Sequence, residues 1–486
     1  MNVEFMRAGL AVTLAVVVAA IPAAGAVAAE ERADAGRVEA YLAQVRNNPQ
    51  RLHAFLQDLP KGGDLHTHLS GAVSTETLIR LGASGGQCIN VVTFVAATGP
   101  CVAGQRPAAD AETDQAFRTQ VIAAWSMEGF QPGQGESGHD HFFNTFGKFG
   151  SITGVPANRP EMLAQVIDKA ARQNELYMES MLTRQGSLVS ALAQRVTFDP
   201  AAPDFTAMLA QVLAGDDLDR IVAAARAETD VDEAAVHSLL RCGTPVAAKG
   251  CAMTVRYLNQ VSRNSAPNVV FTQMVYGFEL ATADQRTVGL NMVQPEDGAV
   301  SLRDYSLHMR MLNYLRGIYP AGHISLHAGE LVPGLVPDAD LRFHIREAVL
   351  IGQAERIGHG VDIRYEDDWP STMRIMARRG IAAEIQLTSN EQILGVSGRD
   401  HPFPTYRALG VPTVLNTDDE GVSRSDLTGD YRRAVTTYHL TYRDLKQISR
   451  AALEHAFLDA ATRQTLLHQL ELMFKAFEHQ YGSVAA

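Results

Sequence analysis

This sequence has few cysteines and no excess of positive charge. Four cysteines among 486 residues are too few for a disulfide scaffold, although they leave room for two bridges. No C-x-x-C motif occurs, which disfavours a cysteine-rich metal site. Lysine and arginine total 42 against 54 aspartate and glutamate residues, for a net charge of −12. Because an acidic surface repels phosphates, we expect no nucleic-acid partner.

The composition is not that of a disordered protein. Hydrophobic residues make up 46% of the chain and charged residues 20%, as is usual for a folded protein. At roughly 150 residues per domain the length suggests about three domains, but one α/β barrel can hold about 250 residues or more. No internal repeat is evident. The length therefore leaves both a multidomain protein and a single large barrel open.

The N-terminus has the pattern of a secretory signal peptide. Residues 8–29 are almost wholly apolar, follow Arg7 and end in A-x-A patterns between Ala24 and Ala28. The alternative is a membrane anchor, because the run approaches the ~20 residues that span a bilayer. Pro22 and the alanine-rich end favour cleavage. We predict a signal peptide over 1–29, export to a periplasm or the cell exterior, and no membrane association afterwards.

The four cysteines fall into two close pairs along the chain. Export to an oxidising compartment favours two local disulfides, Cys88–Cys101 and Cys242–Cys251, out of three connectivities. The alternative is four free thiols.

Short apolar runs alternate with longer amphipathic stretches after a helix-like arm at 30–60. We interpret eight runs as strands: 63–69, 176–182, 253–258, 269–280, 323–328, 356–361, 381–387 and 412–416. This alternation favours an α/β fold, a parallel (β/α)8 TIM-type barrel, over a sandwich. We assign the barrel to 61–435, with insertions at about 84–141 and 184–251, and helices packed on it to 436–486.

Histidines and acids stand near the ends of four predicted strands. His66 and His68 are two residues apart on a strand, so both imidazoles point to one side and can reach one ion. Three further runs add chemistry of the same kind: His327 with Glu330, His359 between two glycines, and Asp418 with Asp419. Singly, each has a structural reading as a packed histidine, an ion pair or a helix cap. Because the carboxyl ends of barrel strands share one face, we expect the set to converge there.

A second histidine pair is interpreted differently. His139 and His141 follow a glycine-rich loop and lead into the helix-like FFNTFGKF, where residues two apart face different ways. We therefore expect a helix start there rather than a metal site.

The motifs KGGDLHTHLSG, SLHAGE, RIGHG, LTSN and LNTDDEG, in this order, resemble the metal-dependent adenosine deaminase family of the amidohydrolase superfamily. The likeness covers nearly all of the chain after residue 60. The N-terminus, the cysteines and LTSNEQIL are most similar to the secreted, growth-factor-related branch. The resemblance implies one zinc ion per chain, held by His66, His68, His327 and Asp418, a donor set that suits zinc and leaves room for a water.

The same resemblance assigns the catalytic steps. Glu330 would protonate purine N1, since an aromatic amidine is a poor electrophile until that nitrogen is protonated. His359 and Asp419 would orient and deprotonate the water on the metal, whose hydroxide attacks C6.

Four residues are implied at the substrate. Ser70 stands where relatives have an acid that contacts the ribose, and Thr282, in ELATAD, where relatives have the glycine of DLAGDE after the fourth strand. Phe143 and Phe146 belong to a helix that covers the purine pocket in the family. The alternatives are a helix cap for Ser70 and core packing for the phenylalanines.

We therefore predict zinc-dependent hydrolytic deamination of adenosine, and of 2′-deoxyadenosine, to inosine and ammonia. The alternatives are a deaminase of a modified nucleoside such as methylthioadenosine, or an extracellular binding or signalling protein on a deaminase scaffold. A binuclear hydrolase would need a bridging lysine, and none of the runs between 176 and 280 contains one. The negative charge favours a neutral nucleoside over AMP. The oligomeric state is left open, with a homodimer as one option.

Overall fold

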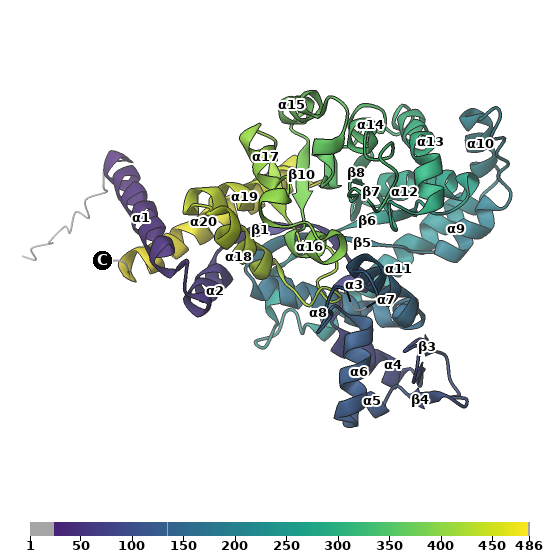
Figure 1. Cartoon of the computed structure of the whole chain (residues 1–486), viewed down its shortest axis with the longest axis horizontal. Coiled ribbons are helices and arrows are strands. Elements are labelled where there is room, and N and C mark those ends of the chain that lie inside the picture. Colours follow the sequence, from purple (N-terminus) through teal and green to yellow (C-terminus); the bar gives the residue numbers. More distant parts are fainter. Residues whose placement is uncertain (1–23, 134, 485–486) are drawn as a thin grey trace, which may run out of the picture.

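A parallel barrel forms the centre of the molecule (Figure 1). The structure is a computed structural model that describes residues 24–133 and 135–484. Its main sheet has the order β1-β5-β6-β7-β8-β9-β10-β11, with every pair parallel. A bridge between Thr67 and Asp418 brings the first strand and the end of the last together, which confirms the predicted (β/α)8 barrel. The barrel strands are β1 (Lys61–His68), β5 (Glu175–Leu182), β6 (Thr254–Ser262), β7 (Thr287–Val293), β8 (His323–Ala328), β9 (Arg356–His359), β10 (Ala382–Ile385) and β11 (Thr413–Leu415).

The fourth predicted strand is wrong. Residues 269–280 lie within the helix α12 (Pro267–Ala283), and the fourth barrel strand is β7. A twelve-residue apolar run is longer than a usual strand, and Pro267 suits the first helical turn. The true strand was overlooked because Gly289 and Asn291 interrupt its apolar residues. Gly289 is required there, since a Cβ would collide with the backbone of His323 in β8.

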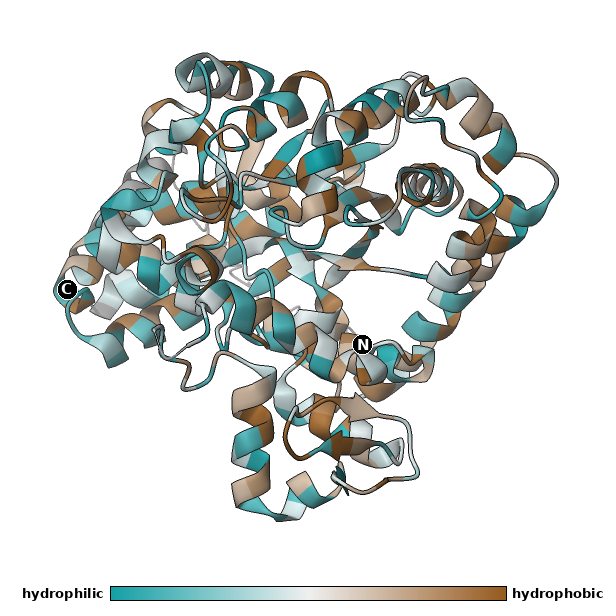
Figure 2. Ribbon diagram, turned by 45° about the vertical axis from the view of Figure 1, so that its right-hand side comes forward, coloured by the Kyte–Doolittle hydropathy of each residue, from teal (hydrophilic) through white to brown (hydrophobic). Residues whose placement is uncertain are grey.

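Helices surround the barrel on its outside (Figure 1). In Figure 2 these helices carry hydrophobic and hydrophilic residues side by side, as expected for helices with one face on a core. They are α8 (Arg159–Arg172), α9 (Gly186–Ala193), α10 (Phe205–Val212), α11 (Asp217–Leu239), α12, α13 (Ala299–Arg316), α14 (His344–Leu350), α15 (Trp369–Arg379), α16 (Leu387–Leu394), α17 (Phe403–Ala408), α18 (Leu427–Tyr438) and α19 (Tyr442–Glu454). Short 3-10 turns occupy Pro156–Asn158, Lys249–Ala252, Ile363–Tyr365 and Gly398–Asp400.

Part of the segment after β1 forms a small lobe that projects from the barrel in Figure 1. After α3 (Leu69–Ala72) and α4 (Thr75–Ser84) come the strands β2 (Cys88–Asn90), β3 (Ala96–Ala97) and β4 (Gln105–Pro107), then α5 (Asp110–Thr113), α6 (Gln115–Trp125) and α7 (Gly138–Thr153). The predicted disulfide Cys88–Cys101 is present in this lobe, and Cys242–Cys251 lies between α11 and β6. Both predicted pairings are therefore confirmed.

The N-terminal arm is helical. α1 (Ala24–Val45) packs against the C-terminal helix α20 (Ala460–Val484), and α2 (Pro49–Asp58) follows α1. Tyr481 of α20 contacts the rings of Tyr41 and Phe55. Most of the predicted signal peptide lies outside the described residues, and its last six residues begin α1. Among the described helices, none combines the length and apolarity that a membrane span requires.

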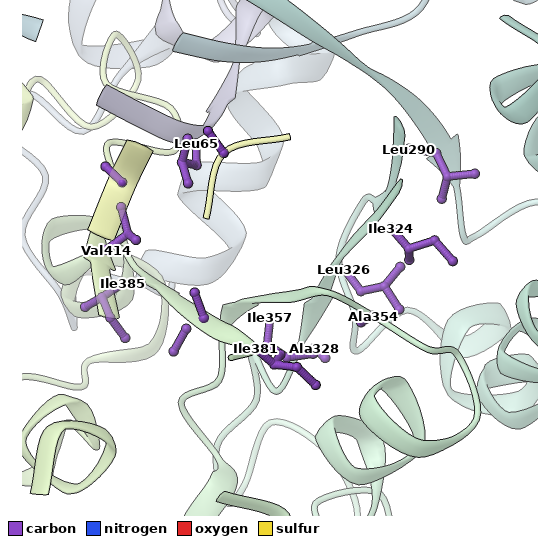
Figure 3. Packing of buried hydrophobic residues seen from close by; sticks show 14 of the residues in the cluster. Leu65, Leu290, Ile324, Leu326, Ala328, Ala354, Ile357, Ile381, Ile385 and Val414 are labelled. Atoms are coloured by element: carbon purple, nitrogen blue, oxygen red, sulfur yellow. The ribbon is translucent and has the colours of Figure 1, made fainter. Parts of the chain in front are cut away.

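The barrel strands alternate between two environments. Leu65, Ile324 and Leu326 are fully buried in the apolar layer under the helices, and Figure 3 shows these side chains with others of the same cluster. Ser325 and His327 alternate with them along β8 and so face the barrel interior. The outer face of each strand thus holds the helices, and the inner face is left for polar chemistry.

Candidate active site

Four predicted metal ligands converge at the carboxyl ends of the strands. His66 and His68 lie on β1, His327 lies on β8, and Asp418 follows β11. The Nε2 atom of His327 is 3.0 Å from that of His66 and 3.1 Å from that of His68. Asp418 Oδ1 is 3.6 Å from His66 Nε2 and 3.4 Å from His68 Nε2. The donors thus come from β1 and from the end of β11, where the barrel closes, and from β8 on the opposite side of the barrel.

Hydrogen bonds on the far side of two imidazoles determine where their protons lie. His66 Nδ1 is 2.6 Å from Glu384 Oε2, and His327 Nδ1 is 2.7 Å from Asn291 Oδ1. Both oxygens can only accept, so each Nδ1 carries the proton and each Nε2 presents a lone pair. Two lone pairs 3.0 Å apart repel unless a cation lies between them. Zinc–nitrogen bonds of about 2.0–2.1 Å in a tetrahedron separate ligand atoms by about 3.3 Å, so the donors fit zinc.

His359 differs from the other histidines of the cluster. The backbone N–H of Phe403 donates to His401 Nδ1 at 3.1 Å, so His401 Nε2 donates to Asn390 Oδ1 at 3.0 Å. Asn390 Nδ2 then donates to His359 Nδ1 at 2.9 Å, which leaves the proton of His359 on Nε2. Although His359 lies within ligand distance of His66, His327 and Asp418, its Nε2 is a donor rather than a ligand.

The three residues predicted for catalysis each have a buried side-chain atom without a hydrogen-bond partner among the described residues. These atoms are Glu330 Oε1, His359 Nε2 and Asp419 Oδ1. An unpaired buried polar atom costs about 1–3 kcal/mol, so their concentration here indicates a ligand site. Burial, and then the charges of Asp418 and Glu296, raise the pKa of Glu330 well above its usual value. Burial therefore favours the protonated form of Glu330.

Two motif glycines make room for site side chains. A Cβ on Gly71 would collide with the carboxylate of Asp419, and a Cβ on Gly358 would collide with the ring of His66. Gly71 of HLSG and Gly358 of RIGHG are therefore required because a neighbouring side chain occupies the space of a Cβ. His359 and Asp418 have φ values of +66° and +60°, a region that residues other than glycine seldom adopt.

Asp64, Glu384 and Asn291, which hold the ligands in place, were not predicted from the sequence. Asp64 accepts from His66 N at 2.9 Å and from Thr417 N at 3.0 Å, so one carboxylate joins β1 to the chain before Asp418. Ser389 Oγ donates to Asp418 Oδ2 at 2.6 Å. Glu384 and Asn291 stand one layer below the histidines. The available signal was a polar residue inside an apolar strand, which does not reveal its partner.

An ion pair crosses the barrel interior. Glu179 of β5 pairs with Arg356 of β9, which also binds Glu384, rather than with Arg256, its neighbour in the register of β5 and β6. Arg256 instead donates to the backbone of Val255. A carboxylate with no exposed surface needs an equally buried cation, and Arg356 provides it.

A cavity of about 320 Å³ opens above the cluster. Ser70, Phe143 and Phe146 line it, together with Gln260 and Gln294. The remaining lining residues are His68, Phe142, Val293, Pro295, His327, Glu330, Ile393, Asp418 and Asp419. No lysine or arginine is among these described lining residues. The walls are therefore largely apolar and aromatic, and the polar groups gather at the floor.

Thr282 does not reach this cavity. It lies on α12, where its hydroxyl donates to Phe278 O at 2.9 Å. The prediction was wrong because it counted α12 as the fourth strand. The residue directly after the true fourth strand is Gln294, whose φ of +78° is one that favours glycine. Gln294 lines the pocket, and its Oε1 accepts from Asn264 N at 3.0 Å.

A parallel barrel with imidazole and carboxylate donors at its carboxyl ends is typical of metal-dependent hydrolases. A family model described as adenosine deaminase matches residues 143–473, which is more than half of the chain. The chain therefore belongs to the adenosine deaminase family.

Individual relatives match over shorter segments. A stretch of 149 residues is 32% identical to an adenosine deaminase of Vibrio atlanticus (strain LGP32) and covers 30% of this chain and 42% of that enzyme. A stretch of 143 residues is 37% identical to an adenosine deaminase of Aliivibrio fischeri (strain MJ11) and covers 27% of this chain and 42% of that enzyme. The aligned segments thus span less than half of these curated relatives.

Solved structures share the fold. The N6-mAMP deaminase of Arabidopsis has a TM-score of 0.55 and 20% identity, covering 86% of this chain and 99% of that chain. The adenine deaminase of Arthrobacter aurescens has a TM-score of 0.54 and 15% identity, with coverage of 86% and 99%. At such identities the likeness concerns the fold alone.

Proposed function

We propose that the protein is a zinc-dependent enzyme that hydrolytically deaminates adenosine, and 2′-deoxyadenosine, to inosine and ammonia. One observation carries the proposal. The Nε2 atoms of His66 and His327 lie 3.0 Å apart at an aromatic cavity that is also lined by Glu330, a carboxyl group whose pKa is raised by burial.

His66, His68, His327 and Asp418 would hold one zinc ion. When bound, zinc lowers the pKa of a coordinated water to about 7 and so supplies a nucleophile at neutral pH.

The surrounding side chains divide the proton transfers. Glu330 would donate its proton to purine N1, which makes C6 open to attack by water. Asp419 Oδ1 accepts a proton from that water, and His359 Nε2 donates a hydrogen bond to its oxygen. Asp419 then passes its proton to the amino group, which leaves as ammonia. The remaining hydroxyl proton returns to Glu330 as the C6 carbonyl forms.

The cavity favours a neutral substrate. Its described lining has no lysine or arginine to pair with a phosphate, so adenosine fits it better than AMP. Phe143 and Phe146 provide aromatic faces for the purine. Ser70 offers a hydroxyl without charge to the sugar, which also allows methylthioadenosine as a second candidate.

We also propose that the enzyme is exported. The N-terminal sequence pattern supports this, and so do two disulfides, because disulfides persist in oxidising compartments.

The test compares substrates and one variant. We expect the absorbance change of deamination to be fastest with adenosine among adenosine, methylthioadenosine, adenine and AMP, in a sample with about one zinc per chain. Glu330→Gln should lower kcat by at least about 10³-fold, because it cannot deliver a proton to N1, while zinc content stays the same. Unchanged turnover in that variant would refute the proposed role, and a preference for AMP would refute the nucleoside assignment.

A further inference from the structure

Glu296 is a buried carboxylate that holds the backbone beside Glu330. It lies three residues after β7, next to the loop that follows β8, and only 1% of it is exposed. Its Oε1 accepts from Gly329 N at 3.1 Å, and its Oε2 accepts from Glu330 N at 2.9 Å. We call this pair of hydrogen bonds the Glu296 clamp.

The clamp is itself anchored. His344 Nδ1 of α14 donates to Glu296 Oε1 at 2.7 Å, and its ring stacks on Tyr305 with centroids 3.7 Å apart. Arg263 Nη1 lies 3.8 Å from Glu296 Oε2. Burial alone would raise the pKa of Glu296, but the His344 hydrogen bond and these cationic neighbours hold it below its usual value. Glu296 is therefore a charged acceptor in a fixed place.

Glu330 depends on this hold. Its carboxyl Oε1 has no hydrogen-bond partner among the described residues and lies 3.5 Å from His359 Nδ1. Gly329 before it has a φ of +77°, and a Cβ there would collide with Asp362 and Ile345. The loop thus makes a tight turn. The hydrogen bonds from the N–H groups of Gly329 and Glu330 to Glu296 fix the direction of the chain after it.

We propose that Glu296 is a positioning residue of the deaminase: its clamp sets the direction in which Glu330 presents its carboxyl group to the purine ring nitrogen. This inference rests on the proposed function. The geometry places no atom of Glu296 at the substrate cavity, so the residue acts through Glu330 rather than by contact with the reacting atoms.

The test is Glu296→Gln. Three donors, the N–H groups of Gly329, Glu330 and His344, point at the carboxylate, whereas an amide offers one oxygen and adds an NH₂ donor. The loop must therefore shift. A displacement of about 1 Å at a reacting group can reduce turnover by about 100-fold, so we expect kcat to fall by about that factor with little change in KM.

A double-mutant cycle separates positioning from general damage. In the Glu330→Gln background, where no proton can be delivered, Glu296→Gln should change kcat by no more than about 2-fold. A merely structural role would reduce kcat equally in both backgrounds, and that result would overturn the inference. Glu478→Gln is the matched control, because Glu478 is a buried carboxylate on α20 that binds Tyr442 and Lys446, and none of these three residues lines the cavity. We expect its kcat to equal that of the wild type.

Hydrogen exchange gives a readout that does not need activity. The amides of Gly329 and Glu330 should exchange faster in Glu296→Gln than in the wild type, and unchanged exchange would contradict the clamp. If Glu296→Gln does not fold, His344→Ala serves instead, with an expected loss of about 10-fold in kcat that disappears in the Glu330→Gln background. An inactive wild type would refute the proposed function, whereas an active wild type with unaffected variants would refute only the clamp.

Discussion

Two layers of the same barrel differ in whether their buried polar atoms have hydrogen-bond partners. In the upper layer, which we call the site layer, Glu330, His359 and Asp419 each have an unpartnered atom among the described residues, and His359 has a positive φ. In the supporting layer directly below, each polar side-chain atom of Glu384, Arg356 and Glu179 has a partner in the described chain.

The difference shows how the barrel keeps a strained site in place. Glu384 joins the two layers, since it binds His66 from below and also binds Arg356 and Ser325. Unpaired groups in the site layer lower stability, and they persist only where surrounding structure fixes them. The satisfied charges of the supporting layer provide that fixation. We therefore expect site-layer substitutions to remove activity and supporting-layer substitutions to remove stability.

The largest effect is expected for His327→Ala in the site layer. Loss of one ligand should prevent zinc binding, and metal-ion catalysis supplies several kcal/mol to the barrier, so kcat should fall by at least about 10³-fold. Zinc at about 100 times its Kd should stabilise the wild type by about 2.7 kcal/mol and leave the variant unaffected. Metal analysis and thermal unfolding with added zinc would measure both. A variant that still binds and responds to zinc would contradict the ligand assignment.

The second effect is expected for Arg356→Met in the supporting layer. It leaves Glu179 and Glu384 buried without their cation, which should cost about 3–5 kcal/mol of unfolding free energy. Burial raises the pKa of Glu384, but Arg356 and His66 lower it to about 2, so the carboxylate stays charged. Urea unfolding of the metal-free protein would measure the loss.

Arg256→Met is the matched control for that experiment. Arg256 faces Glu179 in the register of β5 and β6, yet its guanidinium donates only to the backbone of Val255 among the described residues. Its replacement should change stability by about 0.5 kcal/mol or less. If both variants lost the same unfolding free energy, the buried ion pairs of the supporting layer would have no special role in stability.

The sequence could reveal the site layer more readily than the supporting one. His66, His68, His327 and Asp418 were found because histidine and aspartate at strand ends form a recurring pattern with a chemical purpose. Glu384 lies in the middle of IAAEIQL, where a single acid carries no sign of its partners. The partners of a barrel-crossing ion pair depend on which strands face each other, and a linear pattern does not contain that information.

The fold was predictable to a similar degree. Seven of the eight strands were found because each is a short, mainly apolar run between longer amphipathic stretches. β7 was not, since Gly289 and Asn291 serve neighbouring strands rather than its own core: the glycine admits the β8 backbone, and Asn291 binds His327. The same error placed a predicted substrate contact at Thr282 and left Gln294 and Glu296 unrecognised.

The smallest effect concerns the rim above both layers, where a partly exposed ion pair joins α7 to the loop after β7. His139 Nε2 lies 3.0 Å from Asp297 Oδ1, and His139 Nδ1 lies 3.2 Å from Asp140 Oδ1. Burial lowers the pKa of His139, but the hydrogen bonds and charges of Asp297 and Asp140 outweigh it and raise that pKa above 6.5. The pair therefore stabilises the fold fully below about pH 6.5, and this stabilisation is lost as the pH rises through the folded-state pKa.

Asp297→Asn tests this dependence. The variant should be less stable than the wild type by about 0.5–1 kcal/mol at about pH 5.5, and the difference should vanish at about pH 9, where His139 is neutral in both proteins. Urea unfolding at the two pH values would measure it. A loss of the same size at both values would mean that the pair acts by packing rather than by charge. The rim would then resemble the supporting layer in stabilising the fold independently of pH. Only the site layer would change its stability with an ion, the zinc that it binds.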